Sequence, residues 1–238
     1  MKNIKPIVLS IAGYDPCGGA GVLADIKTME QHHVTGFAVT TAITYQTESN
    51  FDGLDWLPEE QVIRQLETLL AQYTPEAIKI GLISYALLEK VLAHIPDNIP
   101  IVWDPIISAS AGYEFENFSP EQLSSILQKV ELVTPNIKEY EQLKLKGATE
   151  CNVLLKGGHA VGHSNDCLIY NFGSMDIIRG VEFSRPYMKH GTGCVLSSAI
   201  ASNLALGKDL KQSCTSAKKY VEAFLQSNDS LLGYHVRG

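Results

Sequence analysis

Short runs of apolar, mostly β-branched residues recur along the first two thirds of the chain. They are bounded by polar or turn-forming residues, and they have the length of strands rather than helices. The runs are Ile7 to Ile11, Phe37 to Thr41, Ala77 to Ile80, Ile101 to Trp103, Leu132 to Thr134 and Val153 to Leu155. Because continuous apolar runs are typical of strands that are buried on both faces, they predict a parallel sheet.

The segments between these runs carry apolar residues at helical spacing, and several begin with serine or proline, which favour helix starts. The predicted helices are Gly21 to His32, Pro58 to Gln72, Ser84 to His94, Pro120 to Lys129 and Ile137 to Leu145. This alternation predicts an α/β fold with a mostly parallel central sheet. In such sheets, ligands bind in the crevice beyond the carboxyl ends of the strands, so the loops there are candidates for a functional site.

The last third of the chain follows a different pattern. Two apolar runs, Cys167 to Asn171 and Asp176 to Arg179, flank Phe172-Gly173-Ser174 and predict a hairpin. Two further helices, Gly193 to Leu206 and Leu210 to Gln226, are predicted near the end of the chain. No linker rich in proline or serine divides the sequence, so we expect one domain over residues 1–238.

The composition excludes several classes of protein. The net charge of -7, without any basic stretch to offset it, disfavours nucleic acids and anionic membranes as partners. The apolar run Ile7 to Ile11 is too short for a signal peptide or a membrane span, so a cytoplasmic location is expected. The five cysteines are scattered and form no C-x-x-C pair, which indicates reduced thiols and suggests neither a disulfide framework nor a zinc site.

The run from His190 to Cys194 opens directly into an apolar helix. Gly191 and Gly193 allow a ligand to approach the backbone closely, and the first amides of a helix lack partners within it, so this turn is a candidate phosphate site. Cys194 lies in the first helical turn, where the helix dipole is expected to favour the thiolate. One interpretation is a nucleophile or proton acceptor beside a phosphoryl group, and the other is a small core cysteine after a tight turn.

A glycine-rich loop, residues 13–21, leads into the helix that carries Asp25. Its glycines do not follow G-x-G-x-x-G, and the chain has no G-x-x-x-x-G-K-[ST], so a Rossmann cofactor and a Walker phosphate loop are disfavoured. Asp25 could accept hydrogen bonds from a ring amine or be only a helix-start carboxylate. Gln46, at the end of the second strand, could donate to and accept from a heteroaromatic ring, or be an exposed loop residue.

Polar residues also follow the later strands. Asp104 ends one strand, and Asn136 and Glu139 come three positions apart after the next. Their oxygens suit Mg²⁺, although Asn136 and Glu139 also have the spacing of a helix cap with a first-turn acid. Lys156 precedes two glycines and could supply a point charge for phosphate or be a solvated lysine beside a turn.

Seven strings in this order resemble the hydroxymethylpyrimidine and phosphomethylpyrimidine kinases of thiamine biosynthesis, in the ribokinase-like superfamily. They are SIAGYDPCGGAGVLADIKT, TTAITYQT, IKIGLIS, WDPIISASAG, VTPNIKEYEQL, VLLKGGH and HGTGCVLSSAIA, within a match from about Pro6 to Lys219. The resemblance implies a three-layer α/β/α sandwich, usually a homodimer. It also implies phosphorylation of 4-amino-5-hydroxymethyl-2-methylpyrimidine, and then of its monophosphate, with ATP and Mg²⁺.

The resemblance further implies a role for each candidate residue. The pyrimidine would be held by Gly13, Asp25 and Gln46, between apolar walls from Leu82 and Ile106. The anion hole would come from the amides of Gly191, Thr192, Gly193 and Cys194, and Cys194 would face the hydroxymethyl group.

Magnesium and its waters would be organised by Asp104, Asn136 and Glu139, with Asp104 and Glu139 as the carboxylate ligands. The nucleotide would be contacted by Asn136, Lys156, Thr192, Gly193 and Lys218, with Lys156 on the phosphates.

The sequence departs from the family pattern at two places. The stretch between Glu139 and Lys156 is short and lacks the helix that usually precedes this strand, and Met188-Lys189 replaces the usual Asn-Thr before His190. In many relatives, moreover, an aspartate takes the position of Cys194 as a base. Two alternatives therefore stay open: a pyridoxal or pyridoxine kinase of the same subgroup, and a catalytically weak pyrimidine-binding regulatory protein. Gln46 and Asp25 favour the aminopyrimidine.

Overall fold

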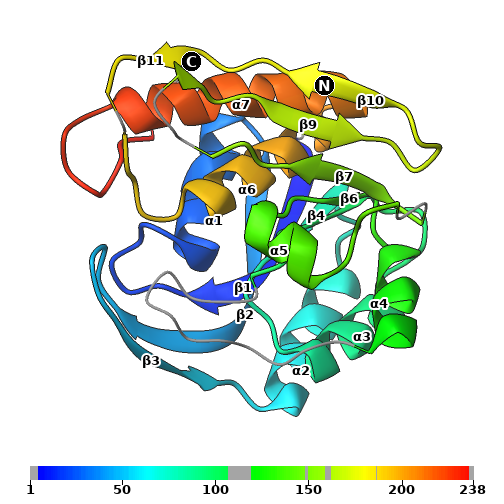
Figure 1. The fold of residues 1–238 in the computed structure, drawn as a ribbon. Helices are drawn as coiled ribbons and strands as arrows, with labels where there is room; N and C mark the ends of the chain where they lie inside the picture. The colour runs from blue at the N-terminus through cyan, green and yellow to red at the C-terminus, as the bar shows by residue number, and fades with distance from the viewer. Residues whose placement is uncertain (1–4, 107–118, 148–149, 159–161, 186, 236–238) are drawn as a thin grey trace.

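Strands and helices alternate as predicted in the computed structural model, which describes residues 5–106, 119–147, 150–158, 162–185 and 187–235 (Figure 1). The main sheet contains β1 (Ile7–Tyr14), β2 (Thr35–Gln46), β3 (Phe51–Trp56), β4 (Ala77–Ile80), β5 (Ile101–Trp103), β6 (Leu132–Val133), β7 (Asn152–Leu155), β9 (Asp166–Ile169) and β10 (Met175–Ile178). A separate small sheet pairs β8 (Gly162–His163) with β11 (Glu182–Phe183).

The order of strands in the main sheet is β10-β9-β7-β6-β5-β4-β1-β2-β3. The six apolar runs that predicted strands correspond to β1, β2, β4, β5, β6 and β7, and these pair with one another in parallel, as expected. Antiparallel pairing is confined to β3 against β2, β9 against β7 and β10 against β9. The hairpin after Lys156 is thus confirmed as β9 and β10, whereas β3 was not predicted.

The helices are α1 (Gly21–Gln31), α2 (Glu59–Leu70), α3 (Tyr85–His94), α4 (Pro120–Leu127), α5 (Ile137–Gln142), α6 (Thr192–Ala205) and α7 (Leu210–Gln226). In Figure 1, α1, α6 and α7 cover one face of the sheet, and α2, α3 and α4 cover the other. Each face has its own apolar core, so the predicted three-layer α/β/α sandwich is confirmed.

Two local features position the site. The described residues between α5 and β7 form turns, in agreement with the helix missing from the shortened sequence, but the helix predicted over Ile137 to Leu145 ends at Gln142. The residue before α6, Gly191, has a φ of 73°, a left-handed conformation that favours glycine. Among the described residues, no helix is both long and apolar enough to cross a membrane.

Candidate active site

A cavity of about 780 Å³ lies where the loops after the parallel strands meet the start of α6. Every site residue predicted from the sequence lines it, with the exception of Asp25. A volume of this order is usual for the binding site of a small molecule, and its place beyond the strand ends is the one expected for this class of sheet. The structure therefore brings together residues that are up to about two hundred positions apart in the chain.

The turn before α6 forms one wall of this cavity through Gly191, Thr192 and Gly193. A Cβ atom on Gly191 would lie 1.9 Å from the carbonyl oxygen of Gly19, so only glycine allows the two loops to touch here. A Cβ atom on Gly193 would lie 3.2 Å from Asp104 Oδ2, which keeps the turn close to the charged residues opposite. The first amides of a helix have no partners within it, so this wall of the cavity suits an anion.

Lys156 lies close to both carboxylates that are predicted to bind the metal. Its Nζ atom lies 2.9 Å from Asp104 Oδ1 and 3.8 Å from Glu139 Oε2. Burial opposes the charge on Lys156, but Asp104 and Glu139 outweigh this effect and raise its pKa. A fixed positive charge is thus present beside the turn at Gly193.

Asn136 and Glu139 form a capping box at the start of α5. The Asn136 side-chain oxygen accepts a hydrogen bond from the Glu139 amide at 3.0 Å, and Glu139 Oε2 accepts one from the Asn136 amide at 2.7 Å. The helix-cap interpretation is therefore confirmed, and the Asn136 oxygen is engaged within the protein. Burial raises the pKa of Glu139, Lys156 opposes this effect, and the nearby Asp104 adds to it.

The expectation that Cys194 favours a thiolate is wrong. Cys194 is buried, and burial raises the pKa of its thiol to about 11, with Lys79 lowering the pKa and Asp25 and Asp104 raising it further. The favourable dipole at the start of α6 does not compensate for the loss of hydration. Cys194 nevertheless lines the cavity next to Gly193, so a protonated thiol is available at the site.

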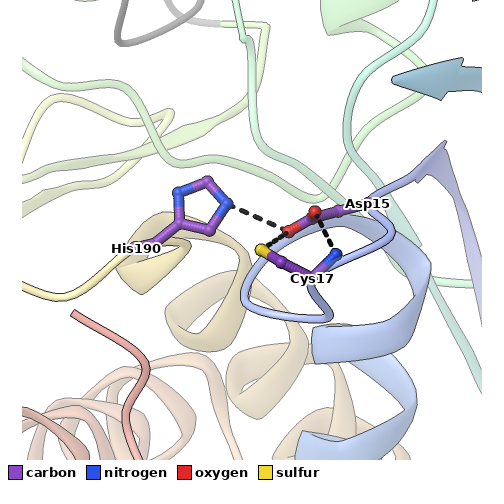
Figure 2. A group of neighbouring side chains, drawn as sticks. All are labelled: Asp15, Cys17 and His190. Carbon is purple, nitrogen blue, oxygen red and sulfur yellow. Dashed lines mark hydrogen bonds and ion pairs between the residues drawn. The ribbon is translucent and has the colours of Figure 1, made fainter. Parts of the chain in front are cut away.

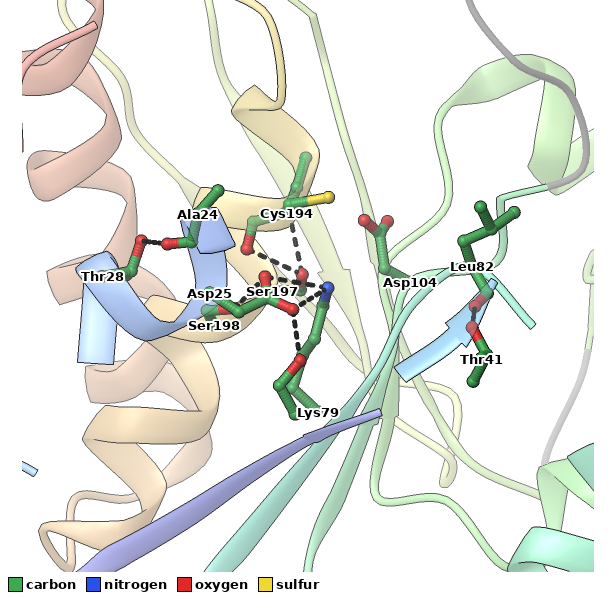
Figure 3. Close-up of polar contacts among 12 residues, drawn as sticks. Ala24, Asp25, Thr28, Thr41, Lys79, Leu82, Asp104, Cys194, Ser197 and Ser198 are labelled. Atoms are coloured by element: carbon green, nitrogen blue, oxygen red, sulfur yellow. Dashed lines mark hydrogen bonds and ion pairs between the residues drawn. The ribbon is translucent and has the colours of Figure 1, made fainter. Parts of the chain in front are cut away.

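Asp25 does not line the cavity, which corrects its predicted place in the pyrimidine site. It is fully buried, and its carboxylate oxygens lie 2.8 and 3.0 Å from Lys79 Nζ. Ser10 and Ser198 also donate hydrogen bonds to it. Figure 3 shows Asp25, Lys79 and Ser198 meeting beneath the helix start that carries Cys194. Asp25 therefore ties α1 to β4 and α6 rather than facing a ligand.

The other predicted pyrimidine-binding residues lie together. Gly13, Gln46, Leu82 and Ile106 all line the cavity, and Gln46 is half-buried at the end of β2. A Cβ atom on Gly13 would lie 2.8 Å from a Leu82 methyl carbon, so the glycine lets this apolar wall come close to the strand end. Thr41 fixes the wall further, because its hydroxyl donates to the Leu82 carbonyl at 2.5 Å (Figure 3).

Lys218, predicted near the nucleotide, lines the cavity from α7 and pairs with Asp166 at 3.0 Å. Both side chains are buried. Asp166 Oδ1 accepts a hydrogen bond from the Gly157 amide at 2.8 Å, while Oδ2, although close to Lys218, makes no hydrogen bond within the part of the chain that the structure describes. Asp166 therefore fixes Gly157, the first glycine after Lys156, through one oxygen and neutralises Lys218 through the other.

The sequence interpretation missed four polar residues at or beneath the site: Asp15, Lys79, Asp166 and His190. A signal existed for Lys79, because a lysine in the middle of the apolar run Ala77 to Ile80 needs a buried partner. Asp15 and His190 stood inside the strings that carried the resemblance. Two of the matched strings extend beyond the described residues, at positions 107–112 and at His159.

Comparison with known proteins decides the family. A sequence model of the family described as phosphomethylpyrimidine kinase matches residues 15–237. The chain belongs to the phosphomethylpyrimidine kinase family. The hydroxymethylpyrimidine/phosphomethylpyrimidine kinase of Staphylococcus aureus is 32% identical over 94% of this chain and 89% of its own length. A Saccharomyces cerevisiae relative of the same description is 34% identical over 91% of this chain, which spans only 45% of that longer protein.

Solved structures agree with the family assignment. The phosphomethylpyrimidine kinase of Clostridium difficile superposes with a TM-score of 0.72 at 29% identity, over 91% of this chain and 98% of that chain. The pyridoxal kinase of Staphylococcus aureus superposes with a TM-score of 0.80 at 26% identity, over 98% of this chain and 94% of that chain. Further structures of that pyridoxal kinase contain ADP or AMP-PCP, so nucleotide binding occurs in a kinase of this fold.

Proposed function

We propose that this member of the family transfers a phosphoryl group from ATP to 4-amino-5-hydroxymethyl-2-methylpyrimidine, and then to the monophosphate, in thiamine biosynthesis. The observation that carries the proposal is a single cavity that joins the Gln46 end, suited to a heteroaromatic ring, to the glycine turn before α6. Relatives that are 32 to 34% identical are named for both phosphorylation steps. The residues that line this cavity would form one continuous path from the ring to the phosphates.

At the ring end, Gln46 would donate to and accept from the nitrogen atoms of the pyrimidine. Leu82 and Ile106 would pack on its faces, as their place in the cavity wall supports. The hydroxymethyl group would then point toward Cys194, which lies on the same wall as Gly193. Asp25 takes no part in this arrangement, since its carboxylate is already used by Lys79 and two serines.

At the phosphate end, the residues fit Mg²⁺ as well as ATP. Asp104 and Glu139 both approach Lys156 Nζ, so two hard oxygen donors face one region of the cavity beside a cation that would bind phosphate. When bound, magnesium would neutralise part of the charge on the phosphate oxygens. Lys156 would hold the transferred phosphate, and Asn136, Thr192, Gly193 and Lys218 would border the nucleotide.

Phosphoryl transfer needs positioning and charge stabilisation more than covalent help from the protein. The amides from Gly191 to Cys194 would stabilise the charge on the equatorial oxygens. The Cys194 thiol holds its own proton at neutral pH. A protonated thiol cannot accept a second proton, so the hydroxyl proton would pass to an oxygen of the transferred phosphate or to solvent as the new bond forms. The anion hole would then contribute more to the reaction than proton abstraction by Cys194.

Phosphorylation of pyridoxal is the second candidate. The high TM-score of the Staphylococcus aureus pyridoxal kinase supports it, and a structure of that kinase contains pyridoxal itself. Both substrates carry a hydroxymethyl group on a heteroaromatic ring. The family model and the relatives above 30% identity favour the pyrimidine.

The direct test is to identify the products by mass spectrometry after incubation with the pyrimidine, ATP and Mg²⁺. We expect the monophosphate first and the diphosphate later. In Gln46→Ala, pyrimidine binding should weaken by about 0.5 to 1.5 kcal/mol, the usual contribution of a neutral hydrogen bond. Absence of any phosphorylated pyrimidine would reject the proposal; a phosphorylated product from pyridoxal would then favour the second candidate, and no product from either substrate would favour a pyrimidine-binding regulatory protein.

We also propose that the chain acts as one kinase domain in a cytoplasmic homodimer. The face of the sheet near β3 supports a dimer, because Tyr14, Ile43 and Tyr45 are 37 to 51% exposed there. Tyr14 is paired with Ile43, and Tyr45 lies two residues farther along β2, so the three side chains share one face. The five cysteines are free, which is usual in a reducing compartment.

A further inference from the structure

A second group of chemically reactive side chains lies at the edge of the cavity. Asp15 and Cys17 belong to the loop after β1, and His190 directly precedes the glycine turn before α6 (Figure 2). Their carboxylate, sulfur and ring nitrogen atoms all lie within 4.8 Å of one another. Asp15 and His190 line the cavity, whereas none of the three has a part in the proposed transfer reaction.

The distances within this group are close to those of a tetrahedral metal site. His190 Nε2 lies 3.0 Å from Asp15 Oδ2, and Cys17 Sγ lies 3.2 Å from the same oxygen. In tetrahedral zinc sites, the usual metal–ligand distances place nitrogen and oxygen about 3.3 Å apart, and sulfur and oxygen about 3.5 Å apart. For a cation to fit, the two separations that involve Asp15 Oδ2 would each grow by about 0.3 Å.

Asp15 Oδ2 is crowded by donors. Besides the thiol and the imidazole, it accepts hydrogen bonds from the amides of Gly19 at 3.1 Å and Ala20 at 2.8 Å. A cation would replace two of these four donors and leave the two amide hydrogen bonds in place. A metal is bound by the thiolate, so the Cys17 thiol proton is released to solvent as the metal binds.

The two loops that carry the ligands are already held together. A Cβ atom on Gly19 would lie 2.6 Å from His190 Cδ2, so the imidazole packs directly on this glycine. The His190 amide also donates to the carbonyl of Leu231 at 2.9 Å, which fixes its backbone from the other side. Binding would thus cost little reorganisation of the chain.

We propose that Asp15, Cys17 and His190 form a binding site for Zn²⁺ or a similar divalent transition metal, with a fourth position left to water or a ligand. A thiolate and an imidazole select such ions over Mg²⁺, which prefers oxygen. Cysteine spacing could not predict this site, because its ligands come from separate loops and only one of them is a cysteine. The inference is independent of the proposed substrate.

The test uses the whole protein after removal of metals with a chelator. Zn²⁺ is titrated in competition with a chromophoric chelator, and Co²⁺ binding is followed by absorption. We expect one Zn²⁺ per chain and a sulfur-to-cobalt charge-transfer band. Cys17→Ser keeps a donor to Asp15 but removes the thiolate. It should weaken Zn²⁺ binding by roughly 10- to 100-fold or more, since even outer-sphere changes cost this much, and abolish the band.

Cys167→Ser is the matched control, because Cys167 is also half-exposed but lies on β9 outside the group. It should bind Zn²⁺ like the unchanged chain. His190→Asn provides a second ligand deletion if Cys17→Ser does not fold. Equal Zn²⁺ affinity in the unchanged chain and in a folded ligand variant would overturn the proposal, as would a cobalt complex without the sulfur band.

Discussion

Two opposing effects act on the pKa of the Cys194 thiol, and burial is the stronger of them. The helix start favours negative charge, but a side chain that is only 6% exposed loses the hydration of its thiolate. The result is a pKa of about 11. A prediction from chain position alone could not include burial, because the residues around Cys194 come from distant parts of the sequence.

The Cys194 variants test whether the thiol takes part in turnover. We expect Cys194→Ala to lower kcat by no more than about 100-fold, the low end of the effect of a lost general base, because the thiol keeps its proton and only positions the substrate hydroxyl. Cys194→Asp, which restores the base of many relatives, should keep the most activity, and Cys194→Ser should fall between the two. A Cys194→Ala variant with normal kcat and a lowered Tm would instead indicate a packing role.

Asp25 shows the limit of sequence reasoning at a single residue. A carboxylate early in a helix has the same sequence pattern whether it faces a ligand or a lysine 54 positions away. Lys79 in its apolar run indicated a buried partner, but identifying Asp25 as that partner required knowing how α1 packs on the sheet beside β1. The remaining site residues were predictable because they follow strand ends, where this fold places its ligands.

At the scale of elements, the Asp25–Lys79 pair links α1 to β4. Lys79→Met leaves the Asp25 carboxylate buried without its counter-ion and should cost about 3 to 5 kcal/mol of unfolding free energy. Adding Asp25→Asn should recover part of this loss. Urea unfolding measures the stability, and calorimetry measures pyrimidine Kd in Asp25→Asn. Normal stability together with a weakened Kd would return Asp25 to the binding site.

The end of the described chain packs on α7 through His235. Its Nδ1 atom lies 3.1 Å from the Tyr220 hydroxyl, and its ring lies 4.9 Å from that of Phe224. Burial lowers the pKa of His235 to about 4, with Lys27 and His32 adding to the effect. The unfolded chain therefore takes up this proton near pH 6.5 and the folded chain only near pH 4, so stability is lost as the pH falls through this interval.

His235→Asn should remove this acid sensitivity. Because the ring is partly exposed, we expect the His235 contribution to the loss between pH 7 and pH 5 to be about 1 to 2 kcal/mol. His33→Asn is the control, since His33 is exposed and adopts a left-handed conformation that asparagine tolerates. Urea unfolding at the two pH values gives the difference. If His235→Asn loses as much stability between pH 7 and pH 5 as the unchanged chain does, the packing of His235 is not the cause of the acid sensitivity.

The elements of the sheet were predictable to different degrees. β1, β4 and β5 are buried runs of apolar residues, and buried parallel strands have that sequence pattern. β3 was missed because it is a half-exposed edge strand, with charged residues and a glycine at φ 147°. β2 is longer than predicted because its end continues beside β3, outside the apolar run.

At the scale of the molecule, the exposed face of Tyr14, Ile43 and Tyr45 predicts the assembly. We expect a particle of twice the chain mass of 26.0 kDa, measured by light scattering after size exclusion. Ile43→Lys should shift it toward the monomer, because a charge is costly to bury in an apolar interface. Ile177→Lys on β10, at the other edge of the sheet, is the control and should leave the mass unchanged. A dimer that persists in Ile43→Lys would place the interface elsewhere.

The ring that occupies the cavity beside Gln46 distinguishes the two candidate substrates. The most direct measurement is kcat/KM for the hydroxymethylpyrimidine and for pyridoxal, in one ADP-release assay with the same protein, ATP and Mg²⁺. We predict a clearly higher value for the pyrimidine, because the relatives above 30% identity and the amide of Gln46 both favour it. A higher kcat/KM for pyridoxal would contradict the account.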